Sequence, residues 1–265
     1  MKIIGEKING TRKGVAQAIA ERDTAYIRDL AARQVEAGSD WLDVNAGTHP
    51  AQEPDDLVWL IEQVQAVTDV PLCLDSANPQ ALITAIEAVD KTPMINSISG
   101  EEKRLEEILP IVAEHGCQVI ALAMDSKSVP ATSEERIAII HRVIKATRAA
   151  GVADEQLYVD PLAMTIATDT SSAVTALETI RQVGKAYPDC HFTIGLSNIS
   201  FGLPARSIVN RTFLTLAMQA GLDSAILDPL DQEIQAAILA TELLLGRDRH
   251  CLNYVRAARS GKLDS

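Results

Sequence analysis

One local pattern recurs along the whole chain and limits the folds that it can adopt. Apolar residues at helical spacing lead to a glycine, a short apolar run follows, and an Asp or Asn comes at the end of that run. A helical period with a C-terminal glycine predicts a helix, and a continuous apolar run predicts a strand covered on both faces. The clearest of these helix-ending glycines are Gly38, Gly116, Gly151 and Gly221.

Eight such units fit into the 265 residues. Their predicted strands end near Glu6, Asn45, Asp75, Asn96, Asp125, Asp160, Asn198 and Asp228. Eight strand–helix units in about 250 residues predict a (β/α)₈ barrel of the TIM type. An open doubly wound sheet is the alternative, but no GxGxxG follows the first strand. Composition does not break anywhere, so we expect residues 1–265 to form a single domain, with 247–265 as an added terminal segment.

Two of the predicted helices begin with the sequence pattern of a capping box. In this pattern a Ser or Thr side chain caps the helix start and a Glu three residues later reaches back to it. Ser99 with Glu102 and Thr132 with Glu135 both have this spacing.

Composition excludes several classes of function. The chain has 24 Lys and Arg against 36 Asp and Glu, a net charge of −12, and only 3% aromatic residues. A nucleic-acid-binding protein needs clustered cations or stacking aromatics, so neither DNA nor RNA is an expected partner. No apolar run approaches the roughly 18 residues of a membrane span, and Met1–Lys7 does not resemble a signal peptide.

The four cysteines point to a reduced, cytoplasmic protein. Cys73, Cys117, Cys190 and Cys251 are far apart and form no CxxC pair, which argues against a structural zinc or thioredoxin-like site. Cys190 and His191 are neighbours that precede the seventh strand, and they are expected at the opposite end of the barrel from the active site.

The predicted strand ends are acidic or amide residues and contain no Lys, Arg, His or Cys. In (β/α)₈ enzymes the active site lies at the C-terminal ends of the strands. Their composition here argues against a Schiff-base lysine, a His-rich hydrolytic metal site and thiol chemistry. His49 falls on a loop at this end and is expected at the surface.

An array of Asp and Asn suits a neutral heterocycle that carries many N–H donors. A carboxylate accepts two coplanar hydrogen bonds from a ring N–H and its neighbouring amino group, and an Asn both donates and accepts. The pterin ring presents such an edge. The same acids would also suit Mg²⁺, which remains the alternative at this point.

Six segments carry a resemblance to a known family. The chain resembles the methyltetrahydrofolate:corrinoid protein methyltransferases, the folate module of cobalamin-dependent methionine synthase and, more distantly, dihydropteroate synthase. The resemblance extends over essentially the whole chain and implies a pterin-binding barrel. The matching segments are residues 5–10, 74–76, 94–97, 158–162, 195–200 and 208–213.

The resemblance implies roles for four strand-end residues. Asp75, Asn96 and Asp160 match the residues that hold the pterin ring, and Asn198 matches the one that reaches N5 of the folate. Asn198 would be the hydrogen-bond partner of N5 in catalysis, with Asp75 and Asp160 in the network that supplies the proton. No bound metal is implied.

Further residues are expected around this pocket. Gly195 and Ser197 would line it, and Arg206 matches an arginine associated with folate binding. Phe201 stands where some members of the family carry Gln, so apolar packing would replace a polar contact. Other polar residues have less defined places: Asp43 and Asn45 as ligands or support, Glu6 and Asn9 as ties of the first loop, and Asp125 and Asp228 as structural acids.

The implied activity is methyl transfer between N5 of 5-methyltetrahydrofolate and the cobalt of cobalamin. The corrinoid would be carried by a separate protein, and the resemblance also implies a homodimer. Two alternatives remain. A dihydropteroate synthase-like enzyme needs basic residues for pyrophosphate, for which Arg206 and Arg211 are available, and a non-catalytic folate-binding protein needs the pocket alone.

Overall fold

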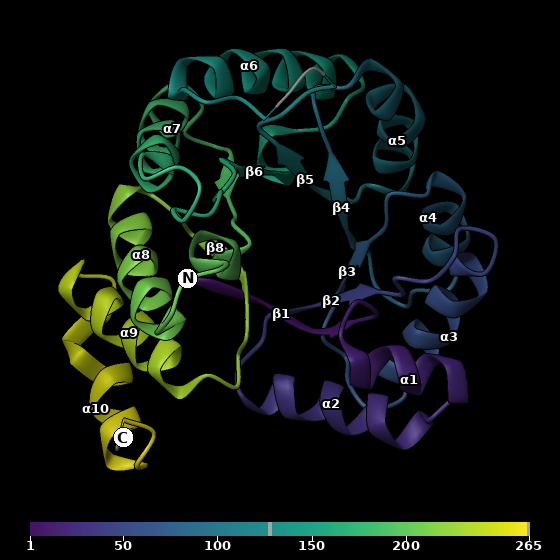
Figure 1. Ribbon diagram of the computed structural model, residues 1–265, viewed down its shortest axis with the longest axis horizontal. Helices are drawn as coiled ribbons and strands as arrows, with labels where there is room; N and C mark the ends of the chain where they lie inside the picture. The colour runs from purple at the N-terminus through teal and green to yellow at the C-terminus, as the bar shows by residue number, and fades with distance from the viewer. Residues whose placement is uncertain (127–128, 264–265) are drawn as a thin grey trace.

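The computed structural model describes residues 1–126 and 129–263, and within them eight parallel strands form one sheet that curves into a barrel (Figure 1). The order of strands is β7-β6-β5-β4-β3-β2-β1-β8. Their bounds are β1 Lys2–Asn9, β2 Trp41–Asn45, β3 Leu72–Asp75, β4 Met94–Ile98, β5 Gln118–Leu122, β6 Leu157–Asp160, β7 His191–Phe192 and β8 Ser224–Leu227.

Helices surround the sheet on the outside of the barrel (Figure 1). They are α1 Lys13–Glu21, α2 Thr24–Glu36, α3 Glu53–Gln65, α4 Pro79–Ile86, α5 Glu102–His115, α6 Ser133–Ala149, α7 Ser172–Ala186, α8 Arg206–Ala220, α9 Gln232–Leu244 and α10 Leu252–Arg259. Three short 3₁₀ turns, η1 Asp154–Gln156, η2 Leu196–Ser200 and η3 Arg249–Cys251, complete the described elements.

The barrel closes between β7 and β8, where the regular ladder ends. The Ile226 N–H donates to the Ile194 carbonyl at 2.9 Å, and the Ser224 hydroxyl donates to the Phe192 carbonyl at 2.9 Å. These bonds join the end of the short strand β7 and the residues that follow it to β8. The predicted (β/α)₈ barrel is confirmed, and the open doubly wound sheet is not the fold.

Side chains that face the barrel interior form two layers, an apolar lower layer and an upper layer that is polar except for Leu122. The lower layer is an apolar cluster made of Ile4, Trp41, Cys73, Met94, Ile120 and Tyr158. Because side chains alternate along a strand, the residue two positions further on each strand faces the same interior, nearer the mouth. Those residues are Glu6, Asp43, Asp75, Asn96, Leu122 and Asp160. The register places Asp75 beside Asn96 and Leu122 beside Asp160.

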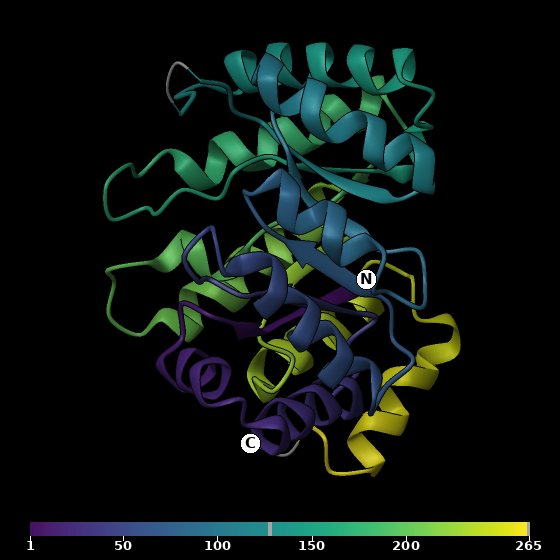
Figure 2. The ribbon, with the colours of Figure 1, turned by 90° about the vertical axis from the view of Figure 1, so that its right-hand side faces the viewer.

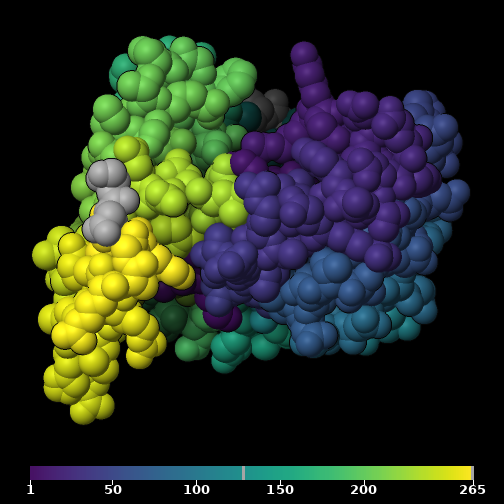
Figure 3. All heavy atoms as spheres, turned by 90° about the horizontal axis from the view of Figure 1, so that it is seen from below, coloured from purple at the N-terminus to yellow at the C-terminus, as the bar shows by residue number. Residues whose placement is uncertain are grey.

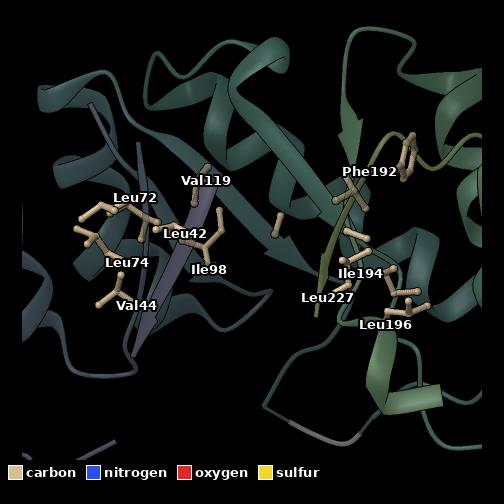
Figure 4. Close-up of a cluster of buried hydrophobic side chains, with 14 of the residues drawn as sticks. Leu42, Val44, Leu72, Leu74, Ile98, Val119, Phe192, Ile194, Leu196 and Leu227 are labelled. Carbon is tan, nitrogen blue, oxygen red and sulfur yellow. The ribbon is translucent and has the colours of Figure 1, made fainter. Parts of the chain in front are cut away.

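The opposite faces of the strands pack against the helices in the main hydrophobic core. Figure 4 shows part of this core, with Leu42, Val44, Leu72 and Leu74 from two neighbouring strands on one side. Side chains around the closing seam, among them Ile194 and Leu227, lie on the other. Coverage on both faces explains why these strands are continuous apolar runs in the sequence.

Local predictions are confirmed at most helix ends, but the start of α5 and the end of the first strand differ from the prediction. Thr132 and Glu135 form the full capping box at the start of α6. The box predicted for Ser99 is wrong: Glu101 is the N-cap of α5, and the Ser99 hydroxyl accepts the Glu101 N–H at 3.3 Å. The first strand continues to Asn9 instead of ending near Glu6.

Residues 247–263 form a segment outside the barrel, as the sequence predicted. Helix α10 packs on α9 and extends beyond the ring of helices (Figures 2 and 3). In Figure 2 the loops after β6 and β7 extend to the left, on the side away from the N-terminus. Among the described residues, none of the helices has the length and apolar character needed to cross a membrane.

Candidate active site

All eight site residues expected from the sequence line one cavity of about 660 Å³ at the C-terminal ends of the strands. They are Asp75, Asn96, Asp160, Gly195, Ser197, Asn198, Phe201 and Arg206. A volume of this size accommodates a small organic ligand. Polar side chains at the floor and a mixed apolar and cationic rim give the cavity two chemically different ends.

Asp43, Asp75 and Asn96 form the floor at the C-terminal ends of β2, β3 and β4, and Asn45 supports Asp75. Asn45 Nδ2 donates to Asp75 Oδ2 at 2.9 Å, and Asn96 Nδ2 donates to Asp43 Oδ1 at 3.3 Å. Burial raises the pKa of Asp43 well above its usual range, and the nearby charge of Asp75 raises it further. Burial likewise raises the pKa of Asp75, against the hydrogen bond from Asn45. The floor therefore holds protons more readily than exposed carboxylates do.

Asp160 faces the same floor from β6. Its side chain is 9% exposed, and the backbone N–H of Leu162 donates to its Oδ1 at 2.8 Å. Burial raises the pKa of Asp160 to about 6, although that hydrogen bond and the charge of Arg136 act in the opposite direction. Above this pH the carboxylate is ionised and can accept hydrogen bonds from a ligand.

The sequence predicted Asn198 at the end of the seventh strand, but the structure places it on the 3₁₀ turn η2. Its exposed side chain lines the cavity next to Gly195, where a β-carbon would approach Asn198 Nδ2 to 2.9 Å. The absence of a side chain at Gly195 therefore leaves room for the amide. The chain leaves the sheet only after Gly195, which still bridges Ile226 of β8, and Asn198 therefore lies beyond the end of the sheet.

Arg206 and Phe201 form one side of the rim. Arg206 Nη2 donates to the Ser197 carbonyl at 2.6 Å and its Nε donates to the Ser200 hydroxyl at 3.0 Å. The guanidinium lies 5.8 Å from the centre of the Phe201 ring, and Phe201 is 68% exposed. Arg206 keeps its positive charge available because these partners are neutral.

Arg12 is a cavity residue that the sequence analysis missed. It follows the first strand and lines the mouth, where its Nη1 lies 3.9 Å from Glu6 Oε1. The Ser197 hydroxyl donates to the same Glu6 atom at 3.3 Å, so the first loop and the turn after β7 meet there. Burial raises the pKa of Glu6. The sequence shows a cation two residues after Gly10, but it does not show that the Arg12 side chain points into the cavity.

The structure also shows the contacts of the polar residues for which the sequence indicated no definite role. Asn9 ties the first loop by accepting the Thr11 N–H at 3.0 Å, and it also lines the cavity. Asp43 lines the cavity directly, whereas Asn45 supports Asp75. Asp125 accepts a hydrogen bond from Arg142 at 2.8 Å. These contacts separate the supporting residues from those that face a ligand.

The expectation that the strand ends contain no cation is wrong for the first strand. Lys7 lies on β1, and its ammonium group forms an ion pair with Asp228 after β8. The pair joins two neighbouring strands, and neither residue is among those that line the cavity. Asp228 thus has a structural partner.

Side chains that could suggest other chemistry lie elsewhere. His191 and the buried Cys190 are at the opposite end of the barrel, where His191 Nδ1 lies 2.5 Å from Asp223 Oδ2. His49 is exposed on the loop after β2. Within residues 1–126 and 129–263, no three His, Cys, Asp or Glu side chains are arranged to hold a metal ion.

A parallel barrel with a cluster of Asp and Asn at its mouth is the arrangement expected of a pterin-binding enzyme. The pterin binding enzyme family matches residues 5–228. The chain therefore belongs to the pterin-binding enzymes, and the resemblance seen in the sequence is confirmed.

Within this family, two relatives bring the comparison closer. The chain is 39% identical over 265 residues to the methylcorrinoid:tetrahydrofolate methyltransferase of Eubacterium limosum, covering 99% of this chain and 98% of that protein. It is 33% identical over 237 residues to methionine synthase of Mycobacterium tuberculosis, covering 84% of this chain but 20% of that much longer protein.

Solved structures with the same fold include dihydropteroate synthases. The enzyme of Xanthomonas albilineans gives a TM-score of 0.70 at 19% identity, with 92% of each chain covered. That of Stenotrophomonas maltophilia gives 0.66 at 20% identity, covering 94% of this chain and 93% of that one. At such identities the similarity establishes the fold alone.

Proposed function

We propose that this protein is a methyltransferase that moves a methyl group between N5 of tetrahydrofolate and the cobalt of a corrinoid carried by a separate protein. The observation that carries the proposal is the placement of Asp75, Asn96, Asp160 and Asn198 around one cavity. The full-length similarity to a methylcorrinoid:tetrahydrofolate methyltransferase supports the choice of reaction.

The floor of the cavity suits the pterin ring. Asp75 and Asp160 lie on separate strands and accept hydrogen bonds, while Asn96 between them in the strand order can donate and accept. A carboxylate that faces an N–H and an adjacent amino group makes two coplanar bonds, which orient the ring as well as bind it. The ring would enter edge first, with its N–H groups toward the acids.

Asn198 is the proposed partner of N5. N5 is a poor leaving group when the methyl group departs, because without a proton it would leave as an amide anion. Uptake of a proton as the N–C bond breaks lets it leave as a neutral amine. In the opposite direction N5 loses that proton as it accepts the methyl group. A hydrogen bond that strengthens along this path lowers the barrier, and Asp75 and Asp160, which line the same cavity, would supply the proton. The corrinoid supplies or accepts the methyl group at its cobalt.

The rim suits the rest of the folate molecule. Arg206 bonds only to neutral groups in the contacts described above, and Arg12 lies 3.9 Å from Glu6 without a hydrogen bond to it. Both guanidinium groups are available to the carboxylates of the glutamate tail. Phe201 offers its exposed ring to apolar groups that approach the mouth.

The dihydropteroate synthase alternative requires a binding site for pyrophosphate. Arg206 lies at the mouth, but Arg211 forms an ion pair with Glu233 at 2.7 Å and does not line the cavity. One of the two cations expected for that chemistry is therefore engaged elsewhere. A non-catalytic folate-binding protein would need the floor but not Asn198.

A spectral assay tests the proposal. The protein is mixed with 5-methyltetrahydrofolate and cob(I)alamin, and formation of methylcob(III)alamin is followed by absorbance. Methyl transfer that depends on the protein supports the proposal. Tight folate binding without transfer to cob(I)alamin or to any corrinoid protein supports the carrier alternative, and release of pyrophosphate with p-aminobenzoate supports the synthase.

We also propose that residues 1–265 act as one domain, that the protein is a homodimer, and that it works in the cytoplasm. Support for a dimer comes from apolar side chains exposed on the last three helices, with Leu244 82% exposed and Leu252 57% exposed. Four free cysteines suit a reducing compartment. Light scattering on the wild-type protein and a Leu244→Glu variant tests the dimer, and cell fractionation tests the location.

A further inference from the structure

Arg136 is a buried cation just behind the wall of the cavity. Its side chain comes from α6 and is 1% exposed. The guanidinium donates to three backbone carbonyls, those of Pro130 at 3.1 Å, Pro161 at 2.7 Å and Leu162 at 2.8 Å. A buried charge with neutral partners is costly, so its retention calls for a reason beyond packing.

Two of the three carbonyls that Arg136 holds, those of Pro161 and Leu162, belong to the turn after β6 that follows Asp160. Leu162 has a φ of 65°, an uncommon conformation for a residue with a side chain. Its N–H donates to Asp160 Oδ1, while its carbonyl accepts from Arg136. The same residue therefore links the guanidinium on one side to the carboxylate on the other.

Charge couples the two side chains as well. Arg136 acts on Asp160 in favour of the ionised carboxylate and opposes the effect of burial. Asp160 and, on the loop after β6, Asp169 are the acids that act on Arg136. Asp43 and Asp75 belong to the same cavity lining as Asp160.

We propose that Arg136 is a positioning residue for Asp160: it fixes the turn after β6 and keeps the carboxylate in its charged, hydrogen-bond-accepting form. Arg136 does not itself line the cavity. The inference rests on the proposed function only in stating that Asp160 binds the pterin.

Direct titration of Asp160 tests the charge effect without any ligand. The protein is labelled with ¹³C at aspartate Cγ, and the Asp160 signal is assigned by its loss in Asp160→Asn. In Arg136→Met we expect the titration midpoint to rise by about one pH unit from the wild-type value, because a neighbouring positive charge is gone. Arg148→Met removes an arginine from the same helix, one that pairs with Asp154, and should leave the midpoint unchanged.

Loss of three carbonyl contacts can also unfold Arg136→Met, so its thermal unfolding is measured first and Arg136→Lys serves as the second variant. Lysine keeps the charge but cannot span the same carbonyls. We expect Arg136→Lys to titrate like wild type and to bind tetrahydrofolate several-fold more weakly, measured by calorimetry.

An unchanged Asp160 midpoint in folded Arg136→Met overturns the charge effect. Wild-type tetrahydrofolate affinity in Arg136→Lys overturns the positioning effect. If the wild-type protein itself does not bind tetrahydrofolate, the proposed function fails, whereas the titration still decides whether Arg136 controls Asp160.

Discussion

Replacing Asp160 with asparagine tests whether the fold holds this carboxylate at a cost to its own stability. Asp160 is almost fully buried, and its pKa rises from an ordinary value of 3.8 to about 6 in the folded protein. The folded state therefore binds the proton more tightly than the unfolded state. At low pH the carboxyl is protonated in both states, so it imposes no penalty. As pH rises from about 4 to 6, ionisation increasingly favours the unfolded state.

The expected magnitude follows from the two pKa values. At about 1.36 kcal/mol for each pH unit, the penalty reaches about 3 kcal/mol above pH 6. Asparagine cannot ionise, and its side-chain oxygen can still accept the Leu162 N–H. The free energy of unfolding of Asp160→Asn, relative to wild type, should therefore rise by about 2.5 kcal/mol between pH 4 and pH 8, because the unfolded carboxyl is already partly ionised at pH 4.

Urea unfolding followed by circular dichroism measures this difference at several pH values. Asp154→Asn is the matched control, because the hydrogen bonds from Arg148 lower the pKa of Asp154. That variant should lose stability near neutral pH, and its loss should disappear as the pH falls. A stability difference for Asp160→Asn that stays constant between pH 4 and pH 8 would refute the reasoning. Tetrahydrofolate binding should weaken in the same variant, since the ionised acceptor is gone.

Three further substitutions test the site and the fold. Asn198→Ala should reduce methyl transfer by roughly 10²-fold or more while changing folate affinity much less, since its hydrogen bond acts on the developing charge at N5; turnover equal to wild type would reject the role. Gly195→Ala should place a methyl group 2.9 Å from Asn198 Nδ2 and displace the amide. The methyl-transfer assay should show lower turnover, and circular dichroism should show that the protein remains folded. Thr132→Ala removes the capping box of α6 and should lower the free energy of unfolding by about 1 kcal/mol in urea titrations, with turnover preserved.

Local chemistry explains why much of the fold follows from the sequence. A helix period, a glycine with positive φ such as Gly116 or Gly151, and a run of apolar residues each depend on neighbours within a few positions. Repetition of that unit eight times leaves few architectures. The Asp and Asn residues after the strands follow from the same reading, because parallel strands in a barrel end at one face.

The remaining features depend on contacts between distant segments. Ser99 has a capping-box spacing, yet the helix begins after Glu101. Lys7 is engaged by Asp228, which lies 221 residues away in the chain. No local pattern contains such a contact, because its geometry depends on the closure of the barrel.

The sequence by itself determined the barrel, the end of the barrel that carries the site, and the acids at that mouth, since these follow from periodicity and residue type. Tertiary structure decided which polar residues share the cavity and in what state. It placed Arg12 at the rim, moved Asn198 onto a turn outside the sheet, and set the buried Arg136 behind Asp160. Burial and the distances between charges control the pKa values of the site, and both exist only once the strands are assembled.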